Sequence, residues 1–280
     1  MADSKSSGAR IGGRLALALL GILLAAAAIT AGFALTSVGK STSGISAKLS
    51  PVGSLPRATG GARTPAGGSA GRASAPSMVP PGRGAIVAVL RRPTVMRASP
   101  AGRPLAAVAV RTPFGSPTVM WVRSVDGSWL GVVSTLAGNN RLGWIPSGSV
   151  SLARVSYRIE VSLAARRLEV LENGRVLRRF TVAIGMAGAP TPTGDFDVTD
   201  RLATHDPTGP YGCCILALSA VSPHPIQGWN GGNRIAIHST PDTASIGLPA
   251  SHGCLRLTMA EGRWLLEHVP LGTPVVISSA

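Results

Sequence analysis

The chain has 280 residues, which is enough for about two domains and excludes a small protein held together only by disulfides. Its 35 glycines and 22 prolines make up about a fifth of the sequence, so part of the chain is expected to be linker. The charge is uneven, because residues 1–153 carry 16 basic and 2 acidic side chains whereas residues 154–280 carry 11 and 10. The basic residues of the front half are mostly single arginines without aromatic neighbours. This pattern argues against nucleic acid as a partner and favours either an ordinary solvated surface or attraction to an anionic envelope polymer or membrane surface.

An uncharged apolar segment runs from Leu15 to Leu35 and is long enough to span the ~30 Å hydrocarbon core of a bilayer. It is preceded by three basic residues, Lys5, Arg10 and Arg14. The charge pattern predicts a cytoplasmic tail over residues 1–14, a transmembrane anchor over 15–35 and translocation of everything that follows. A cleaved signal segment is the alternative, since small residues around 25–34 could supply the cleavage site. The rest of the chain is expected on the extracytoplasmic side, either anchored or secreted.

Residues 36–83 consist largely of Ser, Gly, Ala, Pro and Thr with scattered Arg or Lys, and they contain no acidic residue. Such a composition cannot bury enough apolar surface to offset the entropy of ordering the chain. We therefore predict a disordered linker that holds the following domains away from the membrane.

The region 84–152 is predicted to be a small all-β domain. Short apolar runs rich in Val, Ile and Trp recur between turn residues, at 85–90, 105–110, 118–122, 129–133 and 143–145. In its strand spacing the region resembles bacterial SH3-like modules. Its tryptophans, Trp121, Trp129 and Trp144, are interpreted as core residues rather than as the lining of a ligand groove.

The region 153–280 is predicted to be a second β-rich domain with a few short helices. Alternating residues at 157–161 and 167–171, followed by Asn173-Gly174 and a run ending at 184, indicate strands joined by a hairpin turn. The spacing of Thr258 and Glu261 matches a capping box, and Pro270 ends the helix that it begins. A last strand is expected over 274–278. The fold class expected of the whole chain is mainly β.

The chain has three cysteines, and two of them, Cys213 and Cys214, are neighbours. Neighbouring Cα atoms are ~3.8 Å apart, below the usual disulfide window, so a bridge between them is expected to be strained, and the sequence leaves their redox state open. Cys254 has no obvious partner. It lies within Ser251-His252-Gly253-Cys254-Leu255-Arg256, sixteen residues after His238. A free cysteine retained outside the cell next to histidines indicates chemical use.

A nucleophilic cysteine needs a base, because an unperturbed thiol is only ~3% thiolate at neutral pH. His252 and His238 are the candidates, and His238 is preferred because it ends an alternating apolar strand that can hold the imidazole rigidly. Gly253 lets the backbone approach a carbonyl closely. The N–H groups of Gly253 and Cys254 could therefore form an oxyanion hole.

These motifs resemble the signature of the L,D-transpeptidase catalytic domain family, which cross-links peptidoglycan. The matching segments are Thr191 to Phe196, Gly231 to Thr240 and Ser251 to Arg256, within a resemblance that covers about Val155 to Ser278. The resemblance implies that Cys254 is the nucleophile, that His238 is its general base and acid, and that Ser239 supports this histidine. His252 is the histidine of the signature, and Arg256 stands where many members have Asn.

The resemblance also implies a mechanism of two covalent steps without a metal or organic cofactor. Cys254 attacks the amide between the third and fourth residues of a donor stem peptide, releases D-Ala and forms a thioester. The amine of an acceptor stem resolves the thioester, whereas water as acceptor would make the protein a carboxypeptidase. Carbapenems are expected to trap Cys254. The other expected partners are anionic cell-envelope polymers and the membrane.

A candidate lid over residues 206–232 contains three of the predicted substrate-binding residues, Tyr211, Trp229 and Gly232, and the others are Ser251 and Arg256. Three alternatives stand beside this interpretation. Cys254 and His238 could be structural residues; His224, His238, His252 and Cys254 could bind zinc, although paired ligand spacings are missing. The protein could also be a non-catalytic wall-binding scaffold with a degenerate enzyme domain.

Overall fold

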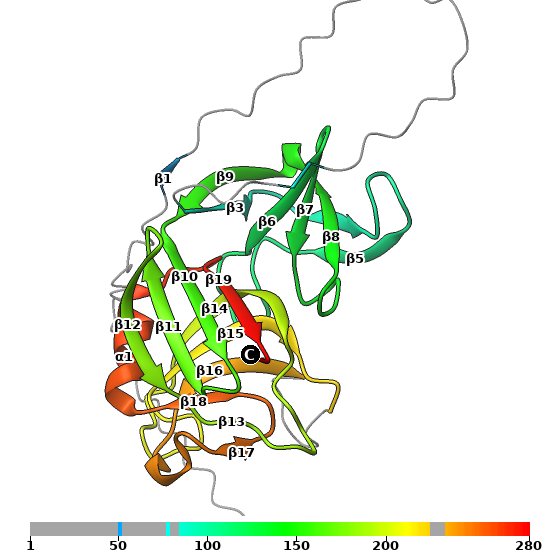
Figure 1. Ribbon diagram of the computed structural model, residues 1–280. Helices are drawn as coiled ribbons and strands as arrows, with labels where there is room; N and C mark the ends of the chain where they lie inside the picture. Colours follow the sequence, from blue (N-terminus) through cyan, green and yellow to red (C-terminus); the bar gives the residue numbers. More distant parts are fainter. Residues whose placement is uncertain (1–49, 52–76, 79–83, 225–232) are drawn as a thin grey trace, which may run out of the picture. The chain divides into compact units, whose positions relative to one another are not determined.

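The computed structural model describes residues 50–51, 77–78, 84–224 and 233–280. The predicted apolar segment at 15–35 lies outside these residues, as do Trp229 and Gly232. Within the described ranges, no helix combines the length and the apolar character that crossing a membrane requires. The described elements are mainly strands, as predicted, and they form the arrangement drawn in Figure 1.

The domain that follows the predicted linker is built from strands that pair both with their neighbours in sequence and with strands far along the chain. They are β3 (Ala85–Leu90), β4 (Thr94–Arg97), β5 (Pro104–Val108), β6 (Val119–Asp126), β7 (Trp129–Val133), β8 (Leu142–Pro146) and β9 (Val150–Val155), with a 3-10 turn η1 (Ser147–Ser149) before β9. Their order in the sheet is β9-β3-β6-β7-β8-β4-β5. Met96, Leu130 and Ile145 are fully buried between them. Trp121 and Trp144 are buried as well, which agrees with their interpretation as core residues.

Two short strands occur within the stretch predicted to be linker. β1 (Ser50–Pro51) pairs antiparallel with β9, and β2 (Ser77–Met78) pairs antiparallel with β6. Backbone pairing along an existing strand uses N–H and C=O groups, which every non-proline residue carries. Composition therefore gives no sign of these two strands.

The second domain contains one sheet whose strand order is β12-β11-β10-β19-β14-β15-β16-β18. Its strands are β10 (Tyr157–Ser162), β11 (Arg167–Glu172), β12 (Arg175–Thr181), β14 (Gly194–Ala203), β15 (Cys214–Val221), β16 (Arg234–Ser239), β18 (Leu255–Leu257) and β19 (Pro274–Ser278). A separate pair joins β13 (Ile184–Gly185) to β17 (Pro249–Ser251). Asn173 and Gly174 both have positive φ at the β11–β12 turn, as an Asn-Gly hairpin requires.

Strand β14 belongs to both halves of this sheet. Residues 194–197 pair with β19, and after a register shift between Val198 and Asp200 the strand continues along β15. Such a bulge bends a strand and increases its twist. Both halves can therefore enclose a single core, in which Phe196, Leu218 and Ile237 are at most 1% exposed.

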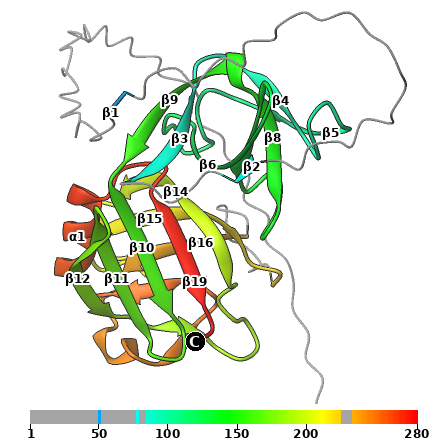
Figure 2. The same ribbon diagram turned by 45° about the horizontal axis from the view of Figure 1, so that its top comes forward.

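The helix α1 (Met259–His268) packs against β15 and β16 (Figure 2). Thr258 and Glu261 form the predicted capping box, with each side chain bonded to the other residue's backbone N–H. A 3-10 turn η2 (Thr243–Ser245) lies between β16 and β17. These elements place the end of β16 beside β18.

The candidate lid over 206–232 is wrong as a single loop, because residues 214–221 form β15 between β14 and β16. The segment Cys214–Val221 is almost continuously apolar, a pattern that suits a strand buried on both faces. The loop before β15 still contains Tyr211, which approaches the site described below.

Candidate active site

The candidate nucleophile and base lie on adjacent parallel strands. In the pairing of β16 with β18, Ile237 is opposite Leu255 and His238 is opposite Arg256. Ile235, Ile237, Leu255 and Leu257 all belong to one buried core. Because successive side chains of a strand point to opposite faces, His238 and Arg256 share the other face, together with Cys254 just before β18. The structure thus brings the sulfur and the imidazole to the same face of the sheet.

The imidazole of His238 is fixed by a backbone carbonyl. Its Nδ1 lies 2.7 Å from the oxygen of Ser239, and the side chain is buried. A carbonyl can only accept, so Nδ1 carries the proton and Nε2 is left as the basic nitrogen. The ring of Tyr211 packs edge-on against the imidazole at 4.9 Å between centroids. Ser239 therefore supports His238 through its main chain, whereas its hydroxyl contacts other groups.

Burial shifts both reactive groups toward their neutral forms. Desolvation raises the pKa of the Cys254 thiol, opposed by a backbone hydrogen bond from Ala236 and by the positive charge of Arg256. The pKa of His238 is lowered to about 4, chiefly by desolvation and also by the charge of Arg256, while the Ser239 carbonyl acts in the opposite direction. At neutral pH the resting site thus contains a thiol and a neutral imidazole.

The turn that carries Cys254 is held by Ser251. The Ser251 hydroxyl donates to the Cys254 carbonyl at 2.6 Å and accepts from the Gly253 N–H at 3.1 Å. Gly253 has φ +114, and a Cβ there would lie 2.8 Å from Ile235 Cδ1. The position therefore needs glycine both for its conformation and for space. One of the two predicted oxyanion donors, the Gly253 N–H, is already bonded to Ser251.

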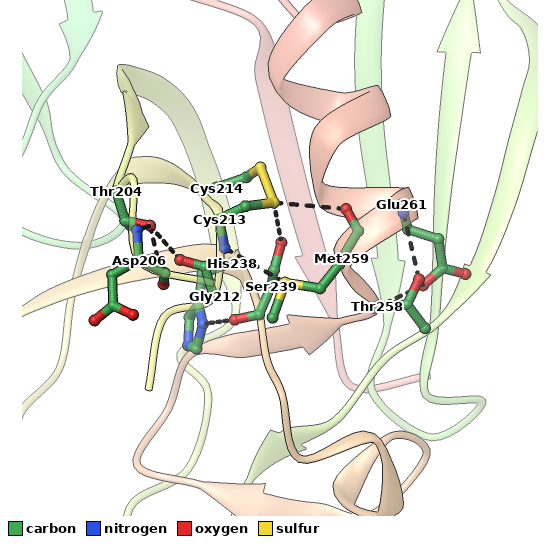
Figure 3. Close-up of a disulfide and its surroundings, with 10 residues drawn as sticks. All are labelled: Thr204, Asp206, Gly212, Cys213, Cys214, His238, Ser239, Thr258, Met259 and Glu261. Atoms are coloured by element: carbon green, nitrogen blue, oxygen red, sulfur yellow. Dashed lines mark hydrogen bonds between the residues drawn. A yellow bond between two sulfur atoms is a disulfide. The ribbon is translucent and has the colours of Figure 1, made fainter. Parts of the chain in front are cut away.

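A disulfide joins Cys213 to Cys214 beside the site, which answers the question of their redox state that the sequence left open. The sulfur of Cys213 lies 3.4 Å from the Ser239 hydroxyl and 3.6 Å from the Met259 carbonyl of α1, and both contacts are drawn in Figure 3. Gly212 packs so closely here that a Cβ would meet Ser239 and Met259. The usual range of Cα–Cα distances describes disulfides between residues apart in sequence. The distance between neighbouring residues therefore did not predict whether this bond forms.

Besides Cys254, His238 and Ser239, the predicted site side chains within the described ranges fall into two groups. Tyr211 and Arg256 lie beside the Cys254 and His238 pair. Burial raises the pKa of Tyr211, the charge of Cys254 raises it as well, and the charge of Arg256 lowers it. The side chain of His252 is exposed, and Ser251 is buried in the turn. The structural roles of Ala236 and of the Cys213–Cys214 bridge were not predicted, because each depends on contacts between strands.

Other concave or polar parts of the molecule do not coincide with this site. Among the described residues, no three His, Cys, Asp or Glu side chains gather as a metal site would require. A cleft of about 610 Å³ is lined by residues such as Trp121, Arg123 and Tyr157, and it contains none of the predicted site residues. The thiol and the imidazole on one sheet face are, by contrast, typical of a cysteine-dependent enzyme that transfers acyl groups.

Comparison with known proteins identifies the family. The L,D-transpeptidase catalytic domain model, YkuD, matches residues 156–277. A Bacillus subtilis strain 168 protein named as the L,D-transpeptidase YkuD is 34% identical over 124 residues, which cover 44% of this chain and 67% of the relative. Its Bacillus licheniformis counterpart is 33% identical with the same coverage. The crystal structure of an L,D-transpeptidase from Xylanimonas cellulosilytica DSM 15894 has 27% identity and a TM-score of 0.32, over 44% of this chain and 60% of that one.

The chain belongs to the L,D-transpeptidase catalytic domain family, whose members are cysteine-dependent acyltransferases. The family predicted from the two linked motifs is confirmed, and with it the class of enzyme.

Proposed function

We propose that this protein is a peptidoglycan L,D-transpeptidase that uses Cys254 as its nucleophile. The observation that carries the proposal is the placement of Cys254 and His238 on one face of β16 and β18. The substrate is a donor tetrapeptide stem, and the reaction exchanges its terminal D-Ala for an acceptor amine. No metal or organic cofactor takes part in this scheme.

The acylation step follows from the resting protonation states. Because the thiol is protonated and His238 Nε2 is basic, the proton passes from sulfur to Nε2 as the sulfur attacks the carbonyl. The C–N bond then breaks, and the protonated His238 delivers its proton to the departing D-Ala nitrogen. We assign the oxyanion to the Cys254 N–H, since the Gly253 N–H already donates to Ser251.

The second step regenerates the thiol. His238 removes a proton from the acceptor amine as that nitrogen attacks the thioester; the bond between sulfur and the acyl carbon then breaks, and His238 returns the proton to the departing sulfur. Water in place of the amine would give a shortened stem and make the protein an L,D-carboxypeptidase. The balance between these outcomes depends on how well the site excludes water.

We also propose that the chain works outside the cytoplasm, because stem peptides lie there and because the segment at 15–35 fits an anchor or a signal. In this arrangement the linker spans the distance to the wall, and the 84–152 region acts as an SH3-like module. The positive charge of the front half favours its binding to anionic envelope polymers.

Product analysis tests the proposed function directly. The full chain is incubated with a defined tetrapeptide stem, with and without an acceptor stem, and the products are identified by mass. We expect D-Ala release and a cross-linked dimer from the wild type, and neither from Cys254→Ala. A tripeptide as the main product, even with acceptor present, would favour the carboxypeptidase. Equal turnover by Cys254→Ala would reject the nucleophile.

A further inference from the structure

Arg256 of β18 is a charged side chain on the Cys254 sheet face that the acylation scheme leaves without a task, and it differs from Arg234 of β16, which is paired with Asp200. It is opposite His238 in the strand register and two residues beyond Cys254. Its main chain is bonded to Ala183 through both the N–H and the C=O. The backbone is therefore fixed, and the alternation of the strand puts the Arg256 side chain on the face that presents the sulfur.

The guanidinium of Arg256 has no carboxylate partner in the described structure. It forms no salt bridge there, and its Nε is buried without a hydrogen bond. Of the 12 acidic residues of the sequence, only Asp3 lies outside the described ranges. The side chain as a whole is half-buried, and a buried donor of a charged group without a partner is costly, so such groups are normally paired.

Its neighbours confirm where the charge acts. The positive charge of Arg256 lowers the pKa of Cys254, which carries the reacting sulfur, and of its neighbours His238 and Tyr211. The Arg256 guanidinium presents a fork of donors that matches a carboxylate.

We propose that Arg256 binds the terminal carboxylate of the donor stem and so selects donors that end in a free D-amino acid. This inference rests on the proposed function, since it concerns the donor of the same reaction. It makes Arg256 a specificity-determining residue, distinct from the groups that transfer protons.

The dimensions agree with this assignment. The carboxylate carbon of the departing D-Ala is one residue beyond the attacked carbonyl carbon, about 3.5 Å away in an extended chain. Arg256 is two residues beyond Cys254, about 6.7 Å along the strand. A long, flexible side chain can cover the remaining few ångströms, and a planar fork can then hold both carboxylate oxygens.

The test compares two donors that differ only at the end of the chain. One tetrapeptide stem ends in a free carboxylate, and the other ends in the corresponding carboxamide. Release of D-alanine or D-alaninamide gives kcat/KM for each donor. A ratio of the two values cancels any change in thiol reactivity, because the same cysteine attacks both substrates. The variants are Arg256→Met, Arg256→Lys and a control, Arg158→Met.

We expect the wild type to prefer the acid by roughly 10- to 100-fold, the value of a charge-assisted contact. Arg256→Met should reduce the preference to about threefold or less, and Arg256→Lys should give an intermediate ratio. Arg158 lies in β10, away from β16 and β18, and its ion pair with Glu160 is partly exposed. Its replacement removes a positive charge from the same domain and should leave the ratio unchanged.

A wild-type acid preference retained by an active Arg256→Met would overturn the proposal. A second measurement does not need that variant to fold: Kd for the acid and the amide in the Cys254→Ala protein. Equal Kd values there would also overturn it, whereas weaker acid binding after Arg256→Lys in that background supports it. Wild-type release of neither leaving group would instead reject the proposed function, so the two failures are distinguishable.

Discussion

Two buried polar clusters of this chain contain similar groups, but one is suited to chemistry and the other to holding strands together. At β16 and β18, Cys254, His238 and Arg256 share one sheet face, and Arg256 has an unpaired buried nitrogen. At the bulge of β14, Asp197 and Asp200 are fully buried. Asp197 Oδ2 accepts from the Trp121 N–H of β6 at 2.7 Å, and its own N–H donates to Ser219.

The two clusters differ in what their partners can do. The groups around Asp197 come from β6 and β15 and fasten the first domain to the second, with Arg234 and Thr112 bonded to Asp200. None of these partners is a thiol or an imidazole. A perturbed titratable group alone therefore does not mark a reactive site, because structural networks shift pKa values as well.

The largest expected effect concerns the base. His238→Gln keeps a polar side chain but removes the basic nitrogen, and we expect acylation by a tetrapeptide stem to fall by about 10²- to 10⁴-fold. Single-turnover measurement of the thioester by mass provides the rate. A loss below tenfold would show that another group takes the thiol proton.

The pH dependence of the wild type sharpens this prediction. Since burial lowers the pKa of His238 to about 4, Nε2 stays basic well below the pH at which an ordinary histidine is protonated. We expect kcat/KM to fall on the acidic side only as pH approaches 4. An acidic limb near 6.5 in the wild type would contradict the buried, neutral imidazole.

The Asp197 cluster should affect stability instead of chemistry. Desolvation raises the pKa of Asp197 to about 6 from 3.8, so the folded chain binds more protons than the unfolded chain between these values. Its contribution to stability is present below pH 3.8 and is lost as pH rises through 6. We expect the free energy of unfolding to fall over this window, on the order of 3 kcal/mol, relative to Asp197→Asn.

Urea unfolding of the full chain at several pH values measures this difference. Asp242→Asn is the matched control, because Asp242 is exposed and undergoes the same chemical change. The wild type and Asp242→Asn should show parallel pH curves. A constant difference between wild type and Asp197→Asn across pH 4 to 6 would contradict the assignment.

The smallest effect is expected for the bridge beside Ser239. Joining adjacent residues closes a very short loop, so the double change Cys213→Ser and Cys214→Ser should cost only about 1 kcal/mol in unfolding free energy. The rate of acylation is the sharper readout, because the Cys213 sulfur contacts Ser239, whose carbonyl holds His238. We expect a few-fold lower kcat with little change in KM. An unchanged kcat would show that the bridge does not position the histidine.

Local patterns predicted much of this molecule. The hairpin at Asn173-Gly174, the capping box at Thr258 and the strand before His238 depend on neighbouring residues, and all appear in the structure. The linked His and Cys motifs predicted the family for the same reason. The buried Asp197 and the contact of Cys213 with Ser239 depend on residues brought together by the fold. The turn role of Ser251 required knowing where its hydroxyl points.

Acylation of one sulfur is the central claim, and mapping a covalent adduct tests it most directly. The full chain is treated with a carbapenem, its intact mass is measured, and the modified peptide is sequenced by mass spectrometry. The account predicts one adduct per chain, located on Cys254 and missing from Cys254→Ala. No adduct, or an adduct on Cys213 or Cys214 with Cys254 unmodified, would contradict it.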